Sequence, residues 1–156
     1  MKQTAKTVSP MSNEGRNAYV TEHITAAILS LLEEKPLSEI SISELCDQAG
    51  VGRASFYRNF QEKEDVLRAY IKGLFDEWTG ELEKDLPLDR LIFALFSHFE
   101  AHRDFYALLS ERGLVLLMKD VILSACGFRP EQETVNAYAS AFAAYSLYGW
   151  VEVWFP

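Results

Sequence analysis

Two short helical segments joined by a glycine-containing turn, within residues 41–60, restrict most strongly what this chain can fold into. The run from Ser41 to Glu44 is a capping box, in which the serine hydroxyl accepts from a first-turn amide and the glutamate reaches back to the cap amide. Gly50 then ends the first helix in the left-handed conformation that glycine tolerates best. The second helix, near Arg53 to Phe60, is too short to be stable alone. The pattern predicts a helix-turn-helix.

Helical rather than strand periodicity continues through the rest of the chain. The sequence of 156 residues contains only 8 Gly and 5 Pro, which favours helices. Pro36 ends the first helix, and Pro130 is well placed to open the last one. We expect an all-α protein, with helices near residues 17–35, 42–49, 53–60, 63–84, 88–102, 105–112, 114–126 and 130–155.

The net charge limits how the chain can meet nucleic acid. The 15 Lys and Arg against 23 Asp and Glu give a net charge of −8, so bulk electrostatics repel both DNA and anionic membranes. The stretch from Ala49 to Gln61, however, holds Arg53 and Arg58 and no acidic residue. Any contact with DNA must therefore be local to the short second helix.

No catalytic or metal site is expected. The sequence has no nucleophile elbow, phosphate loop or pair of catalytic carboxylates. His98 and His102 share a helix face, but Glu100 does not follow the first histidine directly and no third ligand has a fitting spacing. We interpret these histidines as a solvated or pocket-edge pair, and we expect no enzyme activity, no metal and no cofactor.

The cysteines and the terminal segments indicate a cytoplasmic protein. Cys46 and Cys126 lie far apart without a metal-binding pattern, so we interpret both as reduced. Residues 1–15 lack an apolar core and are expected to form a flexible polar arm rather than a secretory signal. Residues 134–151 carry no charge, but their many alanines and polar side chains favour a tightly packed helix over a membrane span.

The block from Ile40 to Leu67 resembles the DNA-binding domain of TetR/AcrR-family transcriptional regulators. Its spacing matches the family pattern at these positions: Ala49-Gly50-Val51, Phe56-Tyr57, Phe60, Lys63-Glu64 and Leu67. The resemblance implies a helix-turn-helix DNA-binding domain over residues 16–62 and a helical effector-binding and dimerisation domain over residues 63–156. The protein would then be a ligand-responsive repressor that binds a double-stranded DNA operator.

The short helix near residues 53–60 would be the recognition helix. Arg53 is the best candidate for a base contact, because its guanidinium can meet guanine in bidentate fashion. Arg58 is expected to touch base or phosphate. At Gly52, where the family often has serine, a side-chain contact to phosphate is lost while the amide remains. The full candidate DNA-binding set is Ser41, Ser43, Gly52, Arg53, Ala54, Ser55, Tyr57, Arg58, Asn59 and Lys63.

The second half of the chain is rich in aromatic residues, most of which must simply form the core. Members of the family use this domain as an effector pocket, so some of these residues are expected to line an apolar cavity for a small apolar effector. Effector binding would tilt the fourth helix and change the spacing of two recognition helices. The candidate pocket residues are Trp78, Phe96, Phe99, Tyr106, Met118, Tyr138, Phe142 and Tyr145.

The last helix and residues 102–113 indicate how the protein could dimerise and how its activity could be controlled. Small residues such as Ala139 and Ala143 let another helix approach closely, and the family resemblance implies a homodimer through the C-terminal helices. The sequence ends at Pro156, where the resemblance implies one further dimerisation helix. Residues 102–113 also resemble a subset of the family related to regulators of dihydroxyacetone kinase operons. Some of its members act as activators alongside a protein partner, so control by a partner rather than by a small molecule is the alternative.

Overall fold

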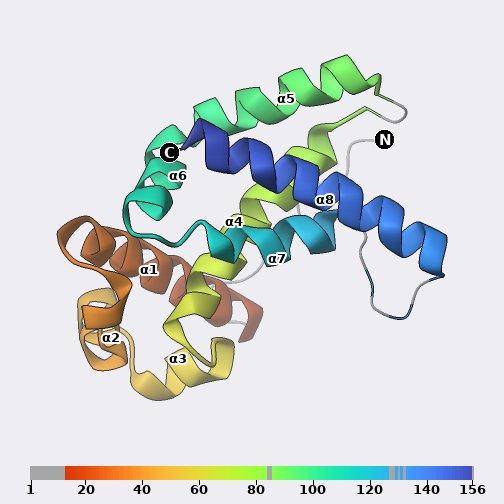
Figure 1. Ribbon diagram of the computed structural model, residues 1–156. Coiled ribbons are helices and arrows are strands. Elements are labelled where there is room, and N and C mark those ends of the chain that lie inside the picture. Colours follow the sequence, from red (N-terminus) through yellow and green to blue (C-terminus); the bar gives the residue numbers. More distant parts are fainter. Residues whose placement is uncertain (1–12, 84–85, 127–128, 130, 132, 156) are drawn as a thin grey trace. The chain divides into compact units, whose positions relative to one another are not determined.

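A computed structural model describes residues 13–83, 86–126, 129, 131 and 133–155. The described residues are helical throughout, without a strand, as the sequence predicts (Figure 1). The chain divides into two compact units between Val66 and Leu67. This division lies four residues beyond the border expected before Lys63. The lysine explains the difference, because its side chain donates hydrogen bonds to the main chain at Leu37 and Ile40 and so holds the first turn of the fourth helix in the first unit.

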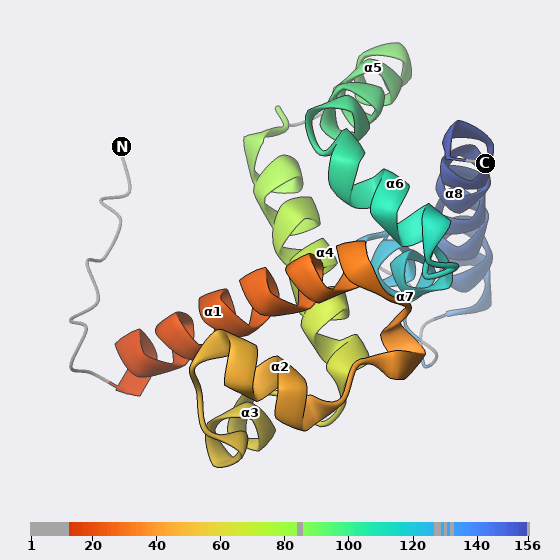
Figure 2. The same ribbon diagram turned by 90° about the vertical axis from the view of Figure 1, so that its left-hand side faces the viewer.

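The first unit contains α1 (Asn13–Glu34), a 3-10 helix η1 (Leu37–Glu39), α2 (Ile42–Ala49), α3 (Arg53–Asn59) and the start of α4 (Lys63–Glu81). α1 contacts both α2 and α3, which lie on the same side of it (Figure 2). The core of this unit consists mainly of aliphatic side chains from α1 and α2, closed by the rings of Phe56 and Phe60. Its buried residues include Ile24, Ile28, Leu31, Leu32, Leu37, Ile40, Leu45, Cys46 and Ala49.

Several helix ends differ from the sequence expectation. α1 begins at Asn13, so the last residues of the expected arm are helical, while residues 1–12 lie outside the described part. The short helix η1 was not predicted. α4 begins where the carboxylate of Asp65 accepts hydrogen bonds from the amides of Gln61 and Glu62, at 3.0 and 3.1 Å. This side chain satisfies amides that lack helical partners at a helix start.

The second unit contains most of α4, then α5 (Leu88–Ala101), α6 (Arg103–Glu111), α7 (Leu116–Ala125) and α8 (Thr134–Trp154). α8 begins four residues after the expected start at Pro130, which lies outside the described residues. α7 packs along α8, and α5 contacts α6. The hydroxyl of Ser110 donates to the carbonyl of Phe155 at 2.8 Å and joins α6 to the end of α8.

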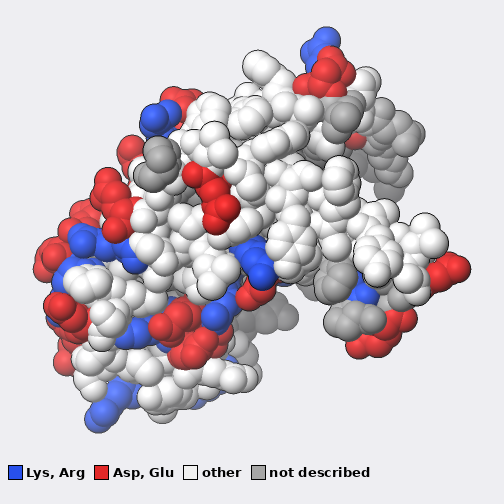
Figure 3. Space-filling view, viewed as in Figure 1, with Lys and Arg blue, Asp and Glu red and all other residues white. Residues whose placement is uncertain are grey.

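α8 presents two contrasting faces. Ala144 and Val151 are buried, whereas a stripe of large apolar side chains on the opposite side is exposed. The surface over this helix is largely free of charged side chains (Figure 3). We call this stripe the α8 face; it consists of Val135, Tyr138, Phe142, Tyr145 and Val153.

Candidate functional site

The N-terminus of α2 has the side-chain hydrogen bond that the capping box predicts. Ser41 is the N-cap, and its hydroxyl accepts from the Glu44 amide at 3.1 Å. The Glu44 carboxylate pairs with the Lys35 ammonium at 2.5 Å. This hydrogen bond lowers the pKa of Glu44, and one with the Ser41 backbone acts in the same direction. The contacts fix the N-terminus of α2 relative to the end of α1.

The turn between α2 and α3 has the predicted geometry. Gly50 has φ 65° and ψ 32°, and its amide donates to the Asp47 and Cys46 carbonyls. Gly52 is the N-cap of α3 with φ −74°, a conformation open to any residue. A Cβ placed on Gly52 would meet nothing within 4 Å, so no steric reason requires glycine there.

α3 separates an apolar face from a polar one. Phe56 is fully buried, and Phe60 follows it into the core. Arg53, Tyr57 and Arg58 are exposed, with 58% of Tyr57 accessible. The exposed face, which we call the α3 face, consists of Arg53, Ala54, Tyr57 and Arg58. It is therefore free to approach a large flat or grooved partner.

The other predicted DNA-binding residues near this face differ in their hydrogen bonds and in their exposure. The Arg53 guanidinium donates to the Ser43 hydroxyl at 3.3 Å, which brings these two together at the surface. Asn59 donates from its side-chain amide to the Ser55 carbonyl at 2.8 Å. Both Ser55 and Asn59 are half-buried, so they are less accessible than the α3 face.

Lys63 has an intramolecular role that the sequence did not indicate. Its ammonium donates to the carbonyls of Leu37 and Ile40, the latter at 2.8 Å. An ammonium has three N–H donors. Two are thus used inside the first unit, which leaves one for the DNA contact that the family resemblance implies.

Sequence reasoning missed Arg16 and Tyr19 near the beginning of α1. With Ser55 and Arg58 they line a hollow of about 220 Å³ beside α3. The first helix was expected to start only near residue 17, and neither Arg16 nor Tyr19 was among the predicted DNA-binding residues. The spacing of three between them was the available signal, since it places both on one side of a helix.

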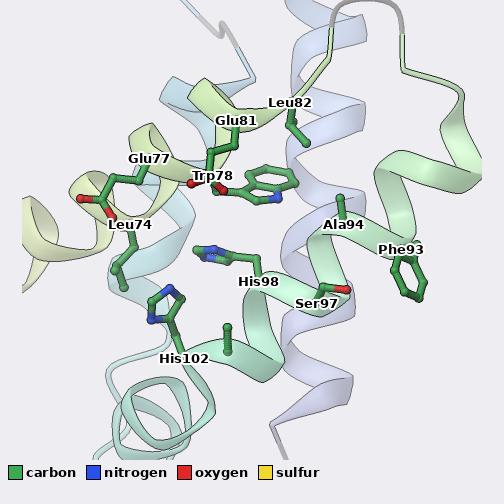
Figure 4. Close-up of a pocket in the computed structure, with 11 residues that line it drawn as sticks. Leu74, Glu77, Trp78, Glu81, Leu82, Phe93, Ala94, Ser97, His98 and His102 are labelled. Atoms are coloured by element: carbon green, nitrogen blue, oxygen red, sulfur yellow. The ribbon is translucent and has the colours of Figure 1, made fainter. Parts of the chain in front are cut away.

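Within the described part of the chain, the candidate effector residues lie in different surroundings. Phe99, Tyr106 and Met118 are buried in the core, and Phe96 stacks on Trp150 and Trp154. The three from α8 lie on its exposed face: Tyr138, Phe142 and Tyr145. Trp78 lines a groove formed by α4 and α5, with a volume of about 500 Å³ (Figure 4).

The groove between α4 and α5 contains two histidines. His98 is 7% exposed, and its Nε2 lies 2.8 Å from the Tyr106 hydroxyl. Burial lowers the pKa of His98 to about 4, and the neighbouring His102 adds to this shift. Within the described residues no group of three His, Cys, Asp or Glu side chains could hold a metal ion.

Comparison with known proteins identifies the first unit. Residues 24–70 match the family model for bacterial regulatory proteins of the tetR family. These residues form a TetR-family helix-turn-helix domain. This is the family that the spacing from residue 40 to 67 resembles.

Curated relatives of this TetR domain are transcriptional regulators. The uncharacterized HTH-type regulator YvdT of Bacillus subtilis is 32% identical over 95 residues, which cover 56% of this chain and 49% of the relative. The regulator EthR of Mycobacterium tuberculosis is 46% identical over 54 residues, covering 35% of this chain and 25% of the relative. YerO of B. subtilis is 27% identical over 104 residues, covering 60% and 36%. The chain thus spans between about a quarter and a half of these relatives.

The same comparisons bear on the class of protein. The relatives are named as transcriptional regulators and not as enzymes. No solved structure matches the chain significantly. Among the helices of the described residues, none is both long and apolar enough to cross a membrane.

Proposed function

We propose that the protein is a sequence-specific DNA-binding transcriptional regulator that acts in the cytoplasm as a homodimeric repressor. The observation that carries this proposal is the exposed α3 face, with Arg53, Tyr57 and Arg58, on a TetR-family domain. In a helix-turn-helix, the second helix enters the major groove and its N-terminal residues contact base edges. Arg53 is the first residue of α3, and we assign it to a guanine contact.

The phosphate contacts are assigned to the residues around α3. Ser43 lies in the first turn of α2, whose N-terminal amides suit a phosphate. Further donors come from α3 and its N-cap: the hydroxyls of Ser55 and Tyr57 and the amide of Gly52. Ser41 acts mainly through its cap, because its hydroxyl already accepts from the Glu44 amide.

Dimerisation is supported by the α8 face. Its residues at positions 135, 138, 142 and 145 recur at spacings of three and four, which places them along one side of the helix. Phe142 is 77% exposed, and large exposed apolar patches mark interaction sites. A second copy pairing through this stripe would present two recognition helices to successive half-sites.

Effector control is proposed for the groove between α4 and α5. Its volume of about 500 Å³ lies in the range of small-molecule sites. The alternative is control by a protein partner bound to the α8 face. It is in keeping with the resemblance of residues 102–113 to the dihydroxyacetone-kinase-regulator subset.

The test is fluorescence anisotropy of the full chain with DNA from upstream of its own gene, across a salt series. We expect specific binding that weakens steeply with salt. Arg53→Ala should weaken it about tenfold or more, whereas Tyr57→Phe should cost less, because it removes one hydrogen bond. The matched control is Arg90→Ala, which removes the same charge from an exposed site on α5.

The Arg90→Ala control distinguishes sequence-specific contacts of α3 from a general electrostatic attraction to DNA. If Arg53→Ala and Arg90→Ala weaken binding equally, α3 does not read the operator. If the unaltered chain shows no preference for the upstream DNA over a scrambled duplex, the proposal fails for that DNA.

A further inference from the structure

A small hollow of the first unit lies between the beginning of α1 and the last turns of α3. α3 lies nearer to the beginning of α1 than to its end in both ribbon views (Figure 1, Figure 2). The polar lining of the hollow includes Arg16 from α1 and both Ser55 and Arg58 from α3, and its volume is about 220 Å³. A water molecule takes up about 30 Å³ of the liquid, so the hollow can hold a larger group.

The lining of this hollow is basic, although the protein as a whole is acidic. It carries the guanidinium groups of Arg16 and Arg58, and among the described residues that line it there is no Asp or Glu. The whole chain, in contrast, has a net charge of −8, and the groove between α4 and α5 carries Glu77 and Glu81. The hollow therefore attracts an anion, against the overall charge of the chain.

The donors of α3 in this hollow are available to a ligand. Arg58 is exposed and forms no hydrogen bond or ion pair within the part of the chain that the structure describes. The carbonyl of Ser55 accepts from Asn59, but its hydroxyl has no partner among the described residues. Guanidinium groups bind phosphate through paired N–H donors, and a hydroxyl adds a further donor. This set of donors therefore suits a phosphate group.

The two arginines of α3 leave the helix on different sides. Arg53 and Arg58 are five residues apart, so their directions around the helix axis differ by about 140°. Arg53 contacts Ser43 of α2 at 3.3 Å, whereas Arg58 lines the hollow next to α1. A helix in the major groove has one sugar-phosphate backbone on each side of it. The α2 side and the α1 side of α3 therefore face different DNA strands.

We infer that the hollow receives a phosphate of the DNA backbone, bound by the guanidinium groups of Arg16 and Arg58 and by the Ser55 hydroxyl. This phosphate belongs to the strand opposite to the one that Ser43 contacts. Arg58 thus binds phosphate rather than reading a base, and Arg16 extends the DNA interface from the helix-turn-helix to α1. The inference rests on the proposed function and names contacts that hold α3 in the groove from its second side.

The first experiment measures binding of the full chain by anisotropy across a salt series, with the upstream duplex and with a scrambled one. We expect Arg16→Ala and Arg58→Ala each to weaken binding about fivefold, and by a similar factor for both duplexes, because a phosphate contact carries no sequence information. The slope of log K against log salt should fall in magnitude by about 1 in each variant. A loss confined to the upstream duplex in Arg58→Ala would show a base contact and overturn the inference.

The matched control is Arg90→Ala, which removes the same charge from an exposed site on α5. Its affinity should stay within about twofold of the unaltered chain and its salt slope should not change. Circular dichroism checks that all three variants fold, as expected for exposed side chains. If Arg16→Ala and Arg58→Ala behave as Arg90→Ala does, the two arginines do not bind DNA and the inference is wrong.

Uncharged phosphates locate the contact. In a set of duplexes, one phosphate at a time is replaced by a methylphosphonate, and each duplex is titrated with the unaltered chain and the variants. At one position the replacement should remove the further effect of both Arg16→Ala and Arg58→Ala, because the group that they bind is already neutral. A position on the other strand should do the same for Ser43→Ala. The inference is overturned if the two arginines share no position, or if their position lies on the strand that Ser43 contacts.

A free phosphorylated molecule is the other source of the same group. Pyrophosphate is therefore titrated into the full chain by isothermal titration calorimetry. We expect it to bind far more weakly than the duplex, which makes further contacts along α2 and α3. Pyrophosphate binding that needs Arg16 and Arg58, together with unchanged DNA binding in both variants, would overturn the backbone contact and assign the hollow to a free anion.

The results for the hollow and for the proposed regulator can be told apart. A chain that prefers the upstream duplex but needs neither Arg16 nor Arg58 would overturn the phosphate contact and leave the regulator intact. A chain that binds both duplexes equally, with one phosphate coupled to both arginines, would overturn sequence-specific regulation and leave the phosphate contact intact. A chain that binds no duplex at all would overturn both.

Discussion

The Nε2 atom of His98 lies 2.8 Å from the hydroxyl of Tyr106, and both side chains are buried in the second unit. The rings of Phe75, Phe99 and Trp78 surround the histidine. This environment lowers the pKa of His98 and raises the pKa of Tyr106, both chiefly through burial. The pair is therefore a neutral hydrogen bond, and protonation of the histidine opposes folding.

The depressed pKa makes the stability of the second unit depend on pH. Above pH 6.5 the imidazole is neutral in both the folded and the unfolded chain. Between pH 6.5 and about 4 the unfolded chain binds a proton that the folded chain does not, so the free energy of unfolding falls as the pH falls. The loss should reach up to about 3 kcal/mol. Urea unfolding followed by circular dichroism at several pH values measures it.

A matched pair of variants isolates this effect. His98→Gln keeps a polar group for the Tyr106 hydroxyl but does not titrate, so its free energy of unfolding should fall less over the same pH range. His23→Gln, which alters a histidine bonded to the Tyr19 carbonyl in the first unit, should retain the pH dependence of the unaltered chain. Identical pH profiles for His98→Gln and the unaltered chain would contradict the buried neutral histidine.

Lys63 is predicted to stabilise the first unit. Lys63→Met removes the donor that meets the Leu37 and Ile40 carbonyls, and should lower the free energy of unfolding by about 1 to 2 kcal/mol. Lys72→Met is the control, because this ammonium pairs with Asp76 on the exposed surface, where such pairs contribute less than about 1 kcal/mol. Unchanged stability together with weakened DNA binding in Lys63→Met would instead assign the lysine to phosphate.

The helix-turn-helix could be predicted from sequence because its signals are local. A cap is decided by the residues within one turn of it, as at Ser41, and a left-handed end by one residue, Gly50. The apolar spacing of Phe56 and Phe60 decides which face of α3 is buried. The partners of Lys63 could not be predicted in this way, since its acceptors lie 26 and 23 residues earlier in the chain.

The second unit could be predicted only as helices. Periodicity places Tyr138, Phe142 and Tyr145 on one side of α8, but does not say whether another element covers that side. Burial of Tyr106 and exposure of Phe142 depend on how the helices pack, which one sequence does not specify. The sequence predicted Trp78 for a pocket and the two histidines for a solvated or pocket-edge position. It did not predict Glu77 and Glu81 of the same groove, since they are ordinary surface residues until α5 lies beside them.

The N-cap of α2 is expected to contribute measurably to the first unit. Ser41→Ala removes the acceptor for the Glu44 amide and should lower the free energy of unfolding by about 1 kcal/mol. Ser41→Asp restores an acceptor and should recover most of the loss. Ser38→Ala, at an exposed site in η1, is the control and should change stability little. Equal thermal denaturation curves for Ser41→Ala and Ser38→Ala would show that the cap contributes nothing.

The α8 face yields the prediction on assembly. Phe142→Glu places a charge in the centre of the exposed stripe, and should convert a dimer into monomers because a buried unpaired carboxylate is costly. The fold itself should survive, since 77% of Phe142 is exposed in the single chain. Asn136→Glu adds the same charge to the same helix outside the stripe and should leave the dimer intact. Sedimentation velocity at micromolar concentration measures the outcome. An unaltered chain that sediments as a monomer would contradict self-association and favour a different protein partner for this face.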